Sequence, residues 1–389
     1  MKKKEIFIIG AKGIPAKYGG FESFVEELTA GQKSPEIHYN VACRRDLSDN
    51  KNDYYTHNNA LCFNVDVPNI GSAAALIYDY KAFEKALELI RTHNITEPIV
   101  YVLACRIGPF IRFLQKKLEK YDGILFVNPD GHEWLRAKWS YPVRMYWRFS
   151  ERLMVKHADL LICDSQNIES YILNQYGKYN PKTTYIAYGS EVKSSLLENS
   201  SYKVTNWYHK FNIKMNDYYL IVGRFVPENN YESMIANFIK SNTKKDLVII
   251  TNVKTNKFYH ELRKKTNFDK DNRIKFVGTV YDSELLRYIR ENAYAYIHGH
   301  EVGGTNPSLL EALASTKVNL LLDVGFNREV GANGAVYWDK GNLYELINQC
   351  DDYSEKYIEC LNEKSSERII EHFSWKSIIG KYESKFLLH

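Results

Sequence analysis

Residues 295–312 read AYIHGHEVGGTNPSLLEA, and this stretch decides the fold that we expect. Ala295–His298 is a short run typical of a buried strand, whereas Pro307–Ala314 has the pattern of a helix with proline in its first turn. The turn between them includes Gly303 and Gly304, which let backbone N–H groups approach a ligand, and the helix N-terminus favours an anion. A strand, a glycine-rich turn and a helix in this order predict one crossover unit of a parallel α/β sheet.

The same alternation continues on both sides of this stretch. Short apolar runs separated by longer amphipathic stretches imply parallel strands that are covered by helices on both faces. The expected strands are Ile6–Ile9, Ile37–Ala42, Ile99–Leu103, Ile124–Val127, Leu160–Cys163 and Thr184–Ala187, then Tyr219–Val222, Leu247–Ile250, Ile274–Val277, Ala295–His298 and Val318–Leu322. The predicted fold class is therefore α/β with two Rossmann-like domains. We expect these domains at 1–190 and 217–370, a polar interdomain region at 191–216, and a C-terminal helix at 371–389 that packs back on the first domain.

Composition excludes several classes of protein. Apolar residues make up 44% and charged residues 25%, as in ordinary soluble globular proteins, which argues against a disordered chain or a collagen. The 52 basic and 47 acidic side chains leave a net charge of only +5, which does not suggest a general nucleic-acid binder. No run reaches the roughly 18–20 apolar residues that span a bilayer, and the N-terminus lacks a secretory signal. The six cysteines form no Cys-x-x-Cys pair, so we expect reduced thiols, no metal site and a cytoplasmic protein.

A second glycine-rich loop, residues 10–22, follows the first expected strand. It is neither Gly-x-Gly-x-x-Gly nor a P-loop, so a nicotinamide or P-loop interpretation is weak. A plain strand–helix turn is the alternative, but four glycines in eleven residues favour an anion-binding loop. The candidate residues of this loop are Gly13, Tyr18, Gly19, Gly20, Phe21 and Glu22.

The loop 128–134 follows the expected strand Ile124–Val127, where ligands bind in open α/β sheets. Asp130 is a candidate catalytic base or orienting group, and His132 is a candidate partner for a sugar hydroxyl or carbonyl. An Asp-Gly pair is also an ordinary turn signal, but the position of the loop favours a functional role.

The segment 141–156 places a row of basic side chains on one helical face among aromatic residues. A basic aromatic helix can rest on an anionic membrane surface, and a solvated face of a core helix is the alternative interpretation. A second basic stretch with Arg112 and Lys116 favours the inner membrane surface as a partner. The candidate lipid patch is Arg144, Trp147, Arg148 and Arg152.

The second half holds candidate residues for a nucleotide and its diphosphate. Arg224 lies at an expected strand end, where an arginine can pair with a phosphate, and backbone N–H groups around Gly304–Ser308 would face a pyrophosphate. Glu311 lies one turn inside the helix and can hold a vicinal diol, although it can also be an ordinary surface residue. The full candidate set for the nucleotide and diphosphate is Arg224, Asn229, Asn230, Gly303, Gly304, Thr305, Asn306, Ser308 and Glu311.

Four motifs together resemble those of bacterial polysaccharide rhamnosyltransferases in glycosyltransferase family 4. They are AKGIPAKYGGFE at 11–22, NPDGHEW at 128–134, VPENN at 226–230 and VGGTNPSL at 302–309. They span most of the chain in order, and the similarity is closest to the streptococcal capsule β-1,4-rhamnosyltransferases. The resemblance implies a GT-B fold, with two Rossmann-like domains that face each other across a cleft. It also makes the loop 10–22 a candidate site for the acceptor or a diphosphate.

The resemblance also implies a chemistry. It implies retaining transfer of rhamnose from dTDP-rhamnose to glucosyl-diphospho-undecaprenol, in a β-1,4 linkage, during capsular or cell-wall polysaccharide synthesis. It implies a peripheral protein at the cytoplasmic face of the cell membrane, with no cofactor and no bound metal. No Asp-x-Asp lies at an expected strand end, which agrees with that last point.

Two residues match motifs of the family, and the sequence departs from those motifs at two places. Arg224 matches the arginine of the segment Gly-Arg-x-x-x-x-Lys-Gly, and Glu311 matches the second glutamate of the E-x7-E motif. Glu301 is the candidate catalytic glutamate facing the donor sugar, but nine residues rather than seven separate it from Glu311. Asn229 or Asn230 stands where the family usually has a phosphate-binding lysine, and the narrower subfamily shares this asparagine pair.

Other interpretations remain open at this point. A family 4 transferase with a UDP-hexose donor is one, because a bidentate Glu311 would favour ribose over the deoxyribose of dTDP. A GT-B nucleotide-sugar epimerase is another, and it would not need the basic aromatic helix. A non-catalytic binding protein on the same fold should tolerate the loss of Arg224 and Glu311, and both are present.

Overall fold

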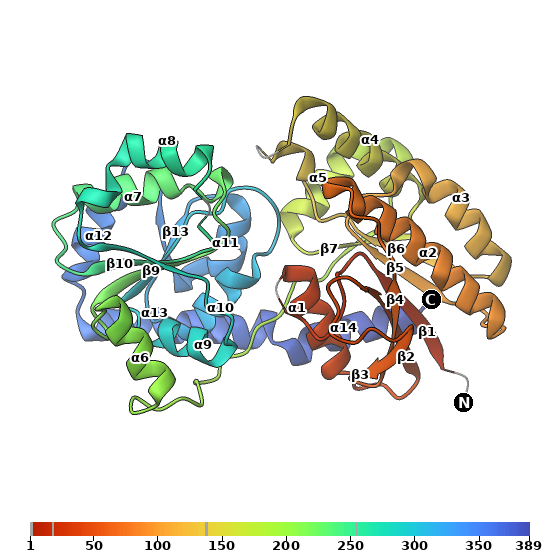
Figure 1. The fold of residues 1–389 in the computed structure, drawn as a ribbon, viewed down its shortest axis with the longest axis horizontal. Helices are drawn as coiled ribbons and strands as arrows, with labels where there is room; N and C mark the ends of the chain where they lie inside the picture. Colours follow the sequence, from red (N-terminus) through yellow and green to blue (C-terminus); the bar gives the residue numbers. More distant parts are fainter. Residues whose placement is uncertain (1–2, 18, 137–138, 254) are drawn as a thin grey trace. The chain divides into compact units, whose positions relative to one another are not determined.

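Figure 1 shows a computed structural model that describes residues 3–17, 19–136, 139–253 and 255–389. The chain forms two compact units. Unit 1 comprises residues 1–189 and 375–389, and unit 2 comprises residues 190–374. Each unit has one central sheet with helices on both faces, which confirms the predicted α/β class with two Rossmann-like domains.

The sheet of unit 1 has the strand order β3-β4-β2-β1-β5-β6-β7-β8. Its strands are β1 (Lys4–Ile9), β2 (Ile37–Arg44), β3 (Tyr54–His57), β4 (Ala60–Val65), β5 (Ile99–Leu103), β6 (Ile124–Asn128), β7 (Leu160–Cys163) and β8 (Thr183–Tyr185). All pairs are parallel except the hairpin β3–β4, which the sequence analysis did not predict. Its two-residue turn, Asn58-Asn59, has both residues at positive φ, as a type I′ turn requires.

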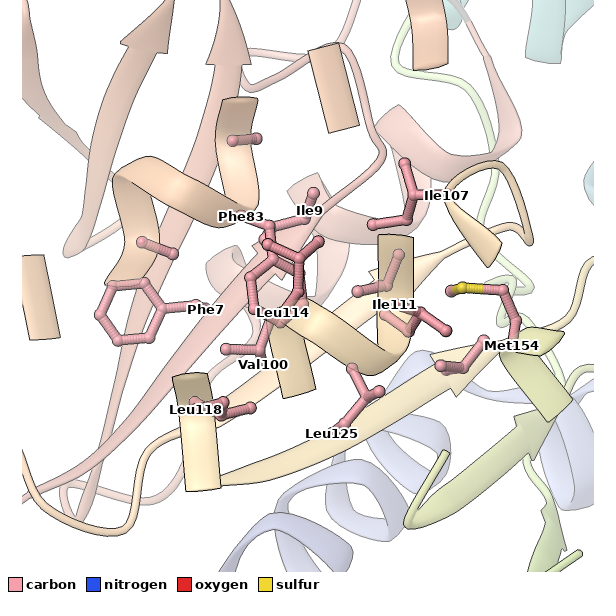
Figure 2. Packing of buried hydrophobic residues seen from close by; sticks show 14 of the residues in the cluster. Phe7, Ile9, Phe83, Val100, Ile107, Ile111, Leu114, Leu118, Leu125 and Met154 are labelled. Carbon is pink, nitrogen blue, oxygen red and sulfur yellow. The ribbon is translucent and has the colours of Figure 1, made fainter. Parts of the chain in front are cut away.

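Helices cover both faces of this sheet, and one face carries the main core. The helices of unit 1 are α1 (Gly20–Ala30), α2 (Ala74–Thr92), α3 (Gly108–Leu118), α4 (Tyr141–His157), α5 (Gln166–Tyr176) and α14 (Trp375–Leu387). Figure 2 shows the core between the strands and the helices α2, α3 and α4, with Phe7, Val100 and Leu125 from strands facing Phe83 and Leu114 from helices. In Figure 1, α2, α3 and α4 lie side by side over this face.

The opposite face of the sheet is closed by α14, which the chain supplies from its C-terminus. Phe386 of α14 packs its ring against Tyr101 of β5 at 6.1 Å and stacks on Phe126 of β6 at 6.0 Å between ring centroids. Tyr382 of the same helix contacts Phe24 of α1 at 5.0 Å. Because these rings are buried, α14 is a structural part of unit 1 rather than a tail.

The sheet of unit 2 has the order β11-β10-β9-β12-β13-β14, and every pair is parallel. Its strands are β9 (Tyr218–Val222), β10 (Asp246–Ile250), β11 (Ile274–Gly278), β12 (Ala295–His298), β13 (Asn319–Leu322) and β14 (Val336–Trp338). Its helices are α6 (Tyr202–Phe211), α7 (Tyr231–Lys240), α8 (Lys257–Thr266), α9 (Ser283–Glu291), α10 (Pro307–Ser315), α11 (Gly325–Gly331), α12 (Leu343–Asp351) and α13 (Glu355–Arg368). The helices α7, α8 and α12 pack on one face, α6 and α9 pack on the other, and α13 contacts α10 and α11.

The expected interdomain region 191–216 is corrected by the structure, because it contains α6 and belongs to unit 2. Val204 and Trp207 of this helix are buried and pack in one cluster with Tyr218 and Ile289. The apolar side chains of α6 recur at helical spacing, but the polar residues that precede them conceal the pattern in the sequence.

We expect the Phe386→Ala variant to lower the free energy of unfolding by about 3–5 kcal/mol, because it empties a fully buried site among aromatic rings. Chemical denaturation of the full chain measures this loss. The neighbouring Leu387→Ala variant is the control, since Leu387 is 42% exposed and its truncation should change the midpoint little. Equal midpoints for the two variants would contradict the role of α14 in closing the core.

Candidate functional site

The candidate donor residues gather where the strand order of unit 2 reverses. The chain passes from β9 outward to β10 and β11, and then returns to β12 on the other side of β9. At such a switch point the loops after the two central strands diverge, and ligands bind at the carboxyl ends of the strands. Arg224 follows β9 and the loop 299–306 follows β12, so the topology brings these predicted residues together.

Hydrogen bonds join the two loops at this point. The amide nitrogen Nδ2 of Asn230 donates to the carbonyl of Gly299 at 2.8 Å, and the backbone N–H of Glu301 donates to the carbonyl of Glu228 at 3.1 Å. Asn229 uses both ends of its side chain, because Nδ2 donates to the carbonyl of Arg224 at 2.7 Å and Oδ1 contacts a ring nitrogen of His300 at 2.8 Å. We predicted Asn229 as a phosphate ligand, but its side chain holds the loops together instead.

The turn before α10 leaves backbone donors unoccupied. Gly303 has φ 130°, which only glycine adopts readily. In the described part of the chain, the backbone N–H groups of Gly303 and Gly304 have no hydrogen-bond partner. The side chain of Asn306 caps the helix by accepting from the N–H of Ser308 at 2.9 Å. The unoccupied donors and the N-terminus of α10 together make an anion-binding surface.

Arg224 is the free cation beside this turn. Its side chain is exposed, and none of the residues that the structure describes forms an ion pair with it. A guanidinium without a protein partner can bind two oxygens of a phosphate at once. The remaining predicted residue of the turn, Thr305, is buried.

Both predicted glutamates of unit 2 are already ion-paired. Glu301 contacts the ammonium group of Lys340 at 2.6 Å. Glu311 on α10 contacts the guanidinium of Arg290 at 2.5 Å through Oε2, although its side chain is 47% exposed. Glu301 is therefore neutralised by a lysine, and Glu311 is anchored at one oxygen and open to solvent.

His298 is a site residue that we did not predict. It is the last residue of β12, it is buried, and its Nε2 has no hydrogen-bond partner among the described residues. Its other ring nitrogen lies 3.2 Å from the hydroxyl of Tyr296. Burial lowers the pKa of His298 to about 3, so the ring is neutral at physiological pH. In the sequence it had no signal beyond its place at a strand end.

Unit 1 has its own switch point between β1 and β5. Gly10 follows β1 with φ 106°, and a Cβ there would lie 2.3 Å from the carbonyl oxygen of Leu103. Ala104 follows β5 with φ 73°, a conformation that costs energy for a residue with a side chain. Arg106 spans the two strand ends by donating to the carbonyls of Gly10 at 3.1 Å and Leu103 at 3.3 Å.

The glycine-rich loop of unit 1 is held by carboxylates of α1. Glu22 is buried and accepts from the N–H of Lys12 at 2.8 Å, and Glu26 accepts from the N–H of Ala16 at 2.9 Å. A Cβ at Gly19 would lie 1.8 Å from the carboxylate of Glu22. Glu22 therefore braces the loop, which corrects its assignment as a residue open to the acceptor or a diphosphate.

The other predicted members of this loop have distinct places. Gly13, with φ 125°, passes so close to Cys43 that a Cβ would lie 2.7 Å from its sulfur. Gly20 is exposed and begins α1, and Phe21 beside it is half-buried. Tyr18 lies outside the described residues.

The loop 128–134 turns through consecutive left-handed residues. Asp130, Gly131 and His132 have φ values of 57°, 78° and 56°. Such a run is sparsely populated for residues with side chains and is typical of functional sites. The ring of His132 lies 4.1 Å from the ring of Tyr171, and burial lowers the pKa of His132. The structure thus brings Asp130 and His132 together on one strained turn.

A buried carboxylate that we did not predict supports this turn. Glu151 of α4 accepts hydrogen bonds from the hydroxyls of Tyr171 and Tyr176, each at 2.6 Å. Burial raises the pKa of Glu151. Tyr171 also accepts from the indole N–H of Trp134 at 3.1 Å, so the turn is tied to both α4 and α5.

The predicted lipid patch on α4 divides into two faces. Arg144 donates to the carbonyl of Trp134 at 2.7 Å, and the guanidinium of Arg148 lies 5.2 Å from the centre of the Trp134 ring. Trp147 contacts the ring of Trp139 at 6.3 Å. Arg144 and Trp147 therefore support the loop rather than face outward, whereas Arg152 is exposed.

Among the described residues, no helix is long and apolar enough to cross a membrane. No three or more histidine, cysteine, aspartate or glutamate side chains there are grouped so that they could hold a metal ion.

Each of the two units matches a known family model. Residues 3–191 match a domain of unknown function named DUF1972, and residues 204–372 match the family model "Glycosyl transferases group 1". The C-terminal half of the chain is therefore similar to the group 1 glycosyltransferases. The second match covers the switch point of unit 2 with Arg224, the glycine turn and Glu311.

Solved structures agree on the fold along the whole chain. Sucrose-phosphate synthase from Thermosynechococcus elongatus has a TM-score of 0.77 at 15% identity, over 99% of both chains. Anabaena HepE in complex with UDP has a TM-score of 0.70 at 14% identity, over 99% of this chain and 100% of HepE. At these identities the likeness shows the fold alone, and that fold is GT-B.

One curated relative is similar in sequence. The O-antigen chain mannosyltransferase RfbU of Salmonella typhimurium is 23% identical over 198 residues, or 51% of this chain. The chain spans about half the length of that relative, 52%.

We expect acid to destabilise the protein through His298. Its pKa is about 3 in the folded state and about 6.5 when unfolded, so only the unfolded state takes up the proton between these values. The free energy of unfolding should therefore fall as the pH drops from about 6.5 toward 3, by about 1 kcal/mol per pH unit. Denaturation of the wild type and the His298→Asn variant across this range measures the contribution. Replacing the exposed His209 in the same way is the control, and equal acid slopes for wild type and His298→Asn would contradict the assignment.

Proposed function

We propose that this chain transfers rhamnose from dTDP-rhamnose to glucosyl-diphospho-undecaprenol, with retention and in a β-1,4 linkage, for capsular or cell-wall polysaccharide. Use of a nucleotide-sugar donor rests on one observation, the exposed Arg224 beside the unoccupied amides of Gly303 and Gly304. The HepE complexes with UDP and UDP-glucose support a nucleotide sugar, and the O-antigen chain mannosyltransferase supports a glycan acceptor. The four sequence motifs support rhamnose and the lipid-linked acceptor.

Unit 2 stabilises the departing nucleoside diphosphate in this proposal. When the bond between the sugar and the diphosphate breaks, negative charge grows on the phosphate oxygens. Arg224 and the N–H groups of Gly303 and Gly304 lower the energy of that charge, because their dipoles are already oriented before the reaction. The acceptor hydroxyl forms the new glycosidic bond and passes its proton to a phosphate oxygen of the leaving group. No resident metal or cofactor is part of this scheme.

Unit 1 orients the acceptor in this proposal. Asp130 and His132 lie on a rigid turn, and the lowered pKa of His132 keeps its ring uncharged near neutral pH. An uncharged imidazole can exchange hydrogen bonds with a sugar hydroxyl without the cost of desolvating a cation. The glycine-rich loop after β1 lies on the same edge of the sheet, with β5 between β1 and β6.

The outer surfaces of α3 and α4 meet the cytoplasmic face of the membrane in this proposal. The α4 side chains Tyr141, Met145 and Phe149 recur every fourth residue and are at least 45% exposed. On α3, Phe110 and Phe113 are exposed as well. The exposed cations around them are Arg112, Lys116, Arg148, Arg152 and Lys156. Apolar side chains beside cations are the combination that binds an anionic bilayer.

A transfer assay tests the proposed reaction. Purified protein and glucosyl-diphospholipid would be mixed with dTDP-rhamnose, UDP-glucose, UDP-galactose or GDP-mannose, with and without EDTA, and products would be weighed by mass spectrometry. We expect a deoxyhexose increment with dTDP-rhamnose only, unchanged by EDTA. A hexose increment would show that the protein is a transferase with a different donor. Free converted sugar without a lipid product would indicate an epimerase.

We expect the Arg224→Ala variant to lower kcat/KM for the donor by about 100-fold, because it removes a charge-assisted contact to the leaving group. The matched control is Arg263→Ala. Arg263 is another exposed arginine of unit 2, and it pairs with Asp269, which lies just after α8. A drop of the same size in both variants would point to a general loss of charge. Unchanged kcat/KM in Arg224→Ala would overturn its role.

We expect the double variant Met145→Ser/Phe149→Ser to lower partition onto phosphatidylglycerol vesicles by about tenfold or more, because each side chain loses its apolar burial. Co-sedimentation measures this, and phosphatidylcholine vesicles should bind the wild type weakly. The control is Leu196→Ser in unit 2, which alters an apolar side chain that is 86% exposed. Equal partition of the double variant and wild type would exclude this face of α4.

A further inference from the structure

Arg290 is a buried arginine that the mechanism above does not use. It lies on α9, its side chain is 5% exposed, and it reaches across to α10. One terminal nitrogen, Nη2, contacts Oε2 of Glu311 at 2.5 Å and Oγ of Ser308 at 3.3 Å. The same guanidinium therefore touches the first turn of α10 and the carboxylate one turn further along.

Stability alone does not account for this arrangement. The Nε of Arg290 is buried and has no hydrogen-bond partner among the described residues. A buried charge with an unsatisfied donor is costly, and burying an ion pair often contributes nothing to folding. Its partner, Glu311, is half-exposed and pairs with Arg290 through Oε2. A buried cation that holds an exposed carboxylate by one oxygen is suited to orient that carboxylate toward a ligand.

Hydrogen bonds link this pair to the other end of the donor site. Oγ of Ser308 donates to the carbonyl of Val222 at 3.2 Å, and the hydroxyl of Tyr296 donates to the same carbonyl at 3.1 Å. Val222 ends β9, two residues before Arg224. Arg290 is thus joined through Ser308 to the strand end that carries the predicted diphosphate ligand. The backbone around Arg290 is itself held, because Thr316 donates to its carbonyl at 3.0 Å.

We propose that Arg290 is a positioning residue that holds Glu311 so that a single carboxylate oxygen faces the pentose of the nucleotide donor. This deepens the proposed function and rests on it. A glutamate on a helix surface loses rotamer freedom when a ligand binds, and the ion pair removes that freedom in advance. With Oε2 engaged by Arg290, Oε1 accepts one hydroxyl. One hydroxyl is what a 2′-deoxyribose offers, so the pair does not require the vicinal diol of ribose.

A double-mutant cycle with nucleotide binding tests this proposal. Affinity for dTDP would be measured by calorimetry for wild type, Glu311→Ala, Arg290→Met and the double variant. We expect Glu311→Ala to weaken binding about tenfold, Arg290→Met to weaken it severalfold, and the double variant to match Glu311→Ala alone. The control is Arg287→Met on the same helix, whose partner is Glu284, and it should leave the affinity unchanged. Additive losses would overturn the positioning role.

Two further readouts separate positioning from a merely structural effect. In the transfer assay, Arg290→Met should raise KM for the donor and leave kcat nearly unchanged, whereas a damaged fold lowers kcat as well. Arg290→Lys keeps the buried charge if Arg290→Met does not fold, and it should recover part of the affinity in a Glu311-dependent manner. If Arg290→Lys binds dTDP with the same affinity with and without the Glu311→Ala substitution, the proposal is overturned.

The comparison of dUDP with UDP isolates the 2′-hydroxyl. We expect the two to bind within about threefold of each other, because one oxygen of Glu311 reads one hydroxyl. A tenfold or greater preference for UDP would overturn the single-oxygen arrangement. No binding of any nucleotide by the wild type would contradict the proposed function itself, whereas normal binding that ignores Arg290 would contradict only this inference.

Discussion

The predicted donor residues of unit 2 depend on one topological constraint, the reversal of strand order between β9 and β12. In a parallel sheet all strands end at the same edge, and at the reversal the chain leaves the two central strands in opposite directions. The gap that results must be bridged before it can hold a ligand in one geometry. Asn229 and Asn230 provide that bridge with their side chains, which reach His300 and the carbonyl of Gly299. The asparagine pair therefore shapes the site rather than binding phosphate through Asn229.

The switch-point loops of the two units differ in whether their backbone N–H groups already bind a carboxylate. In unit 1 the carboxylates of Glu22 and Glu26 occupy the N–H groups of Lys12 and Ala16. Backbone donors that already serve a carboxylate attract no further anion. In unit 2 none of the described residues offers a carboxylate to the N–H groups of Gly303 and Gly304, and Arg224 adds a cation that has no ion pair among them. This contrast favours the diphosphate in unit 2 and uncharged hydroxyl groups in unit 1, independently of any family resemblance.

Strand and helix periods predicted the two sheets and the helix that carries Glu311, because both depend on local sequence. The hairpin β3–β4 escaped prediction since its turn, Asn58-Asn59, lacks the glycine that usually marks such turns. Long-range packing was harder still. Glu151 becomes part of the loop site only because Tyr171 and Tyr176, on another helix, bond to it. Arg144 faces inward because Trp134 offers it a carbonyl, which helical spacing cannot reveal.

Both switch points contain an arginine paired with an acid, and the difference between the pairs is informative. In unit 1 Arg106 pairs with Asp79 at 3.0 Å, and Asp79 is completely buried, where burial raises its pKa despite the guanidinium. Such a closed pair can only hold the strand ends together. In unit 2 the burial is reversed, since Arg290 is buried and Glu311 is half-exposed. A buried cation can be neutralised cheaply only if its anion stays in place, so the exposed carboxylate is kept at the surface in one orientation. An arginine–carboxylate ion pair thus holds the strand ends together in unit 1, whereas in unit 2 it orders an exposed carboxylate that can accept a hydrogen bond from a ligand.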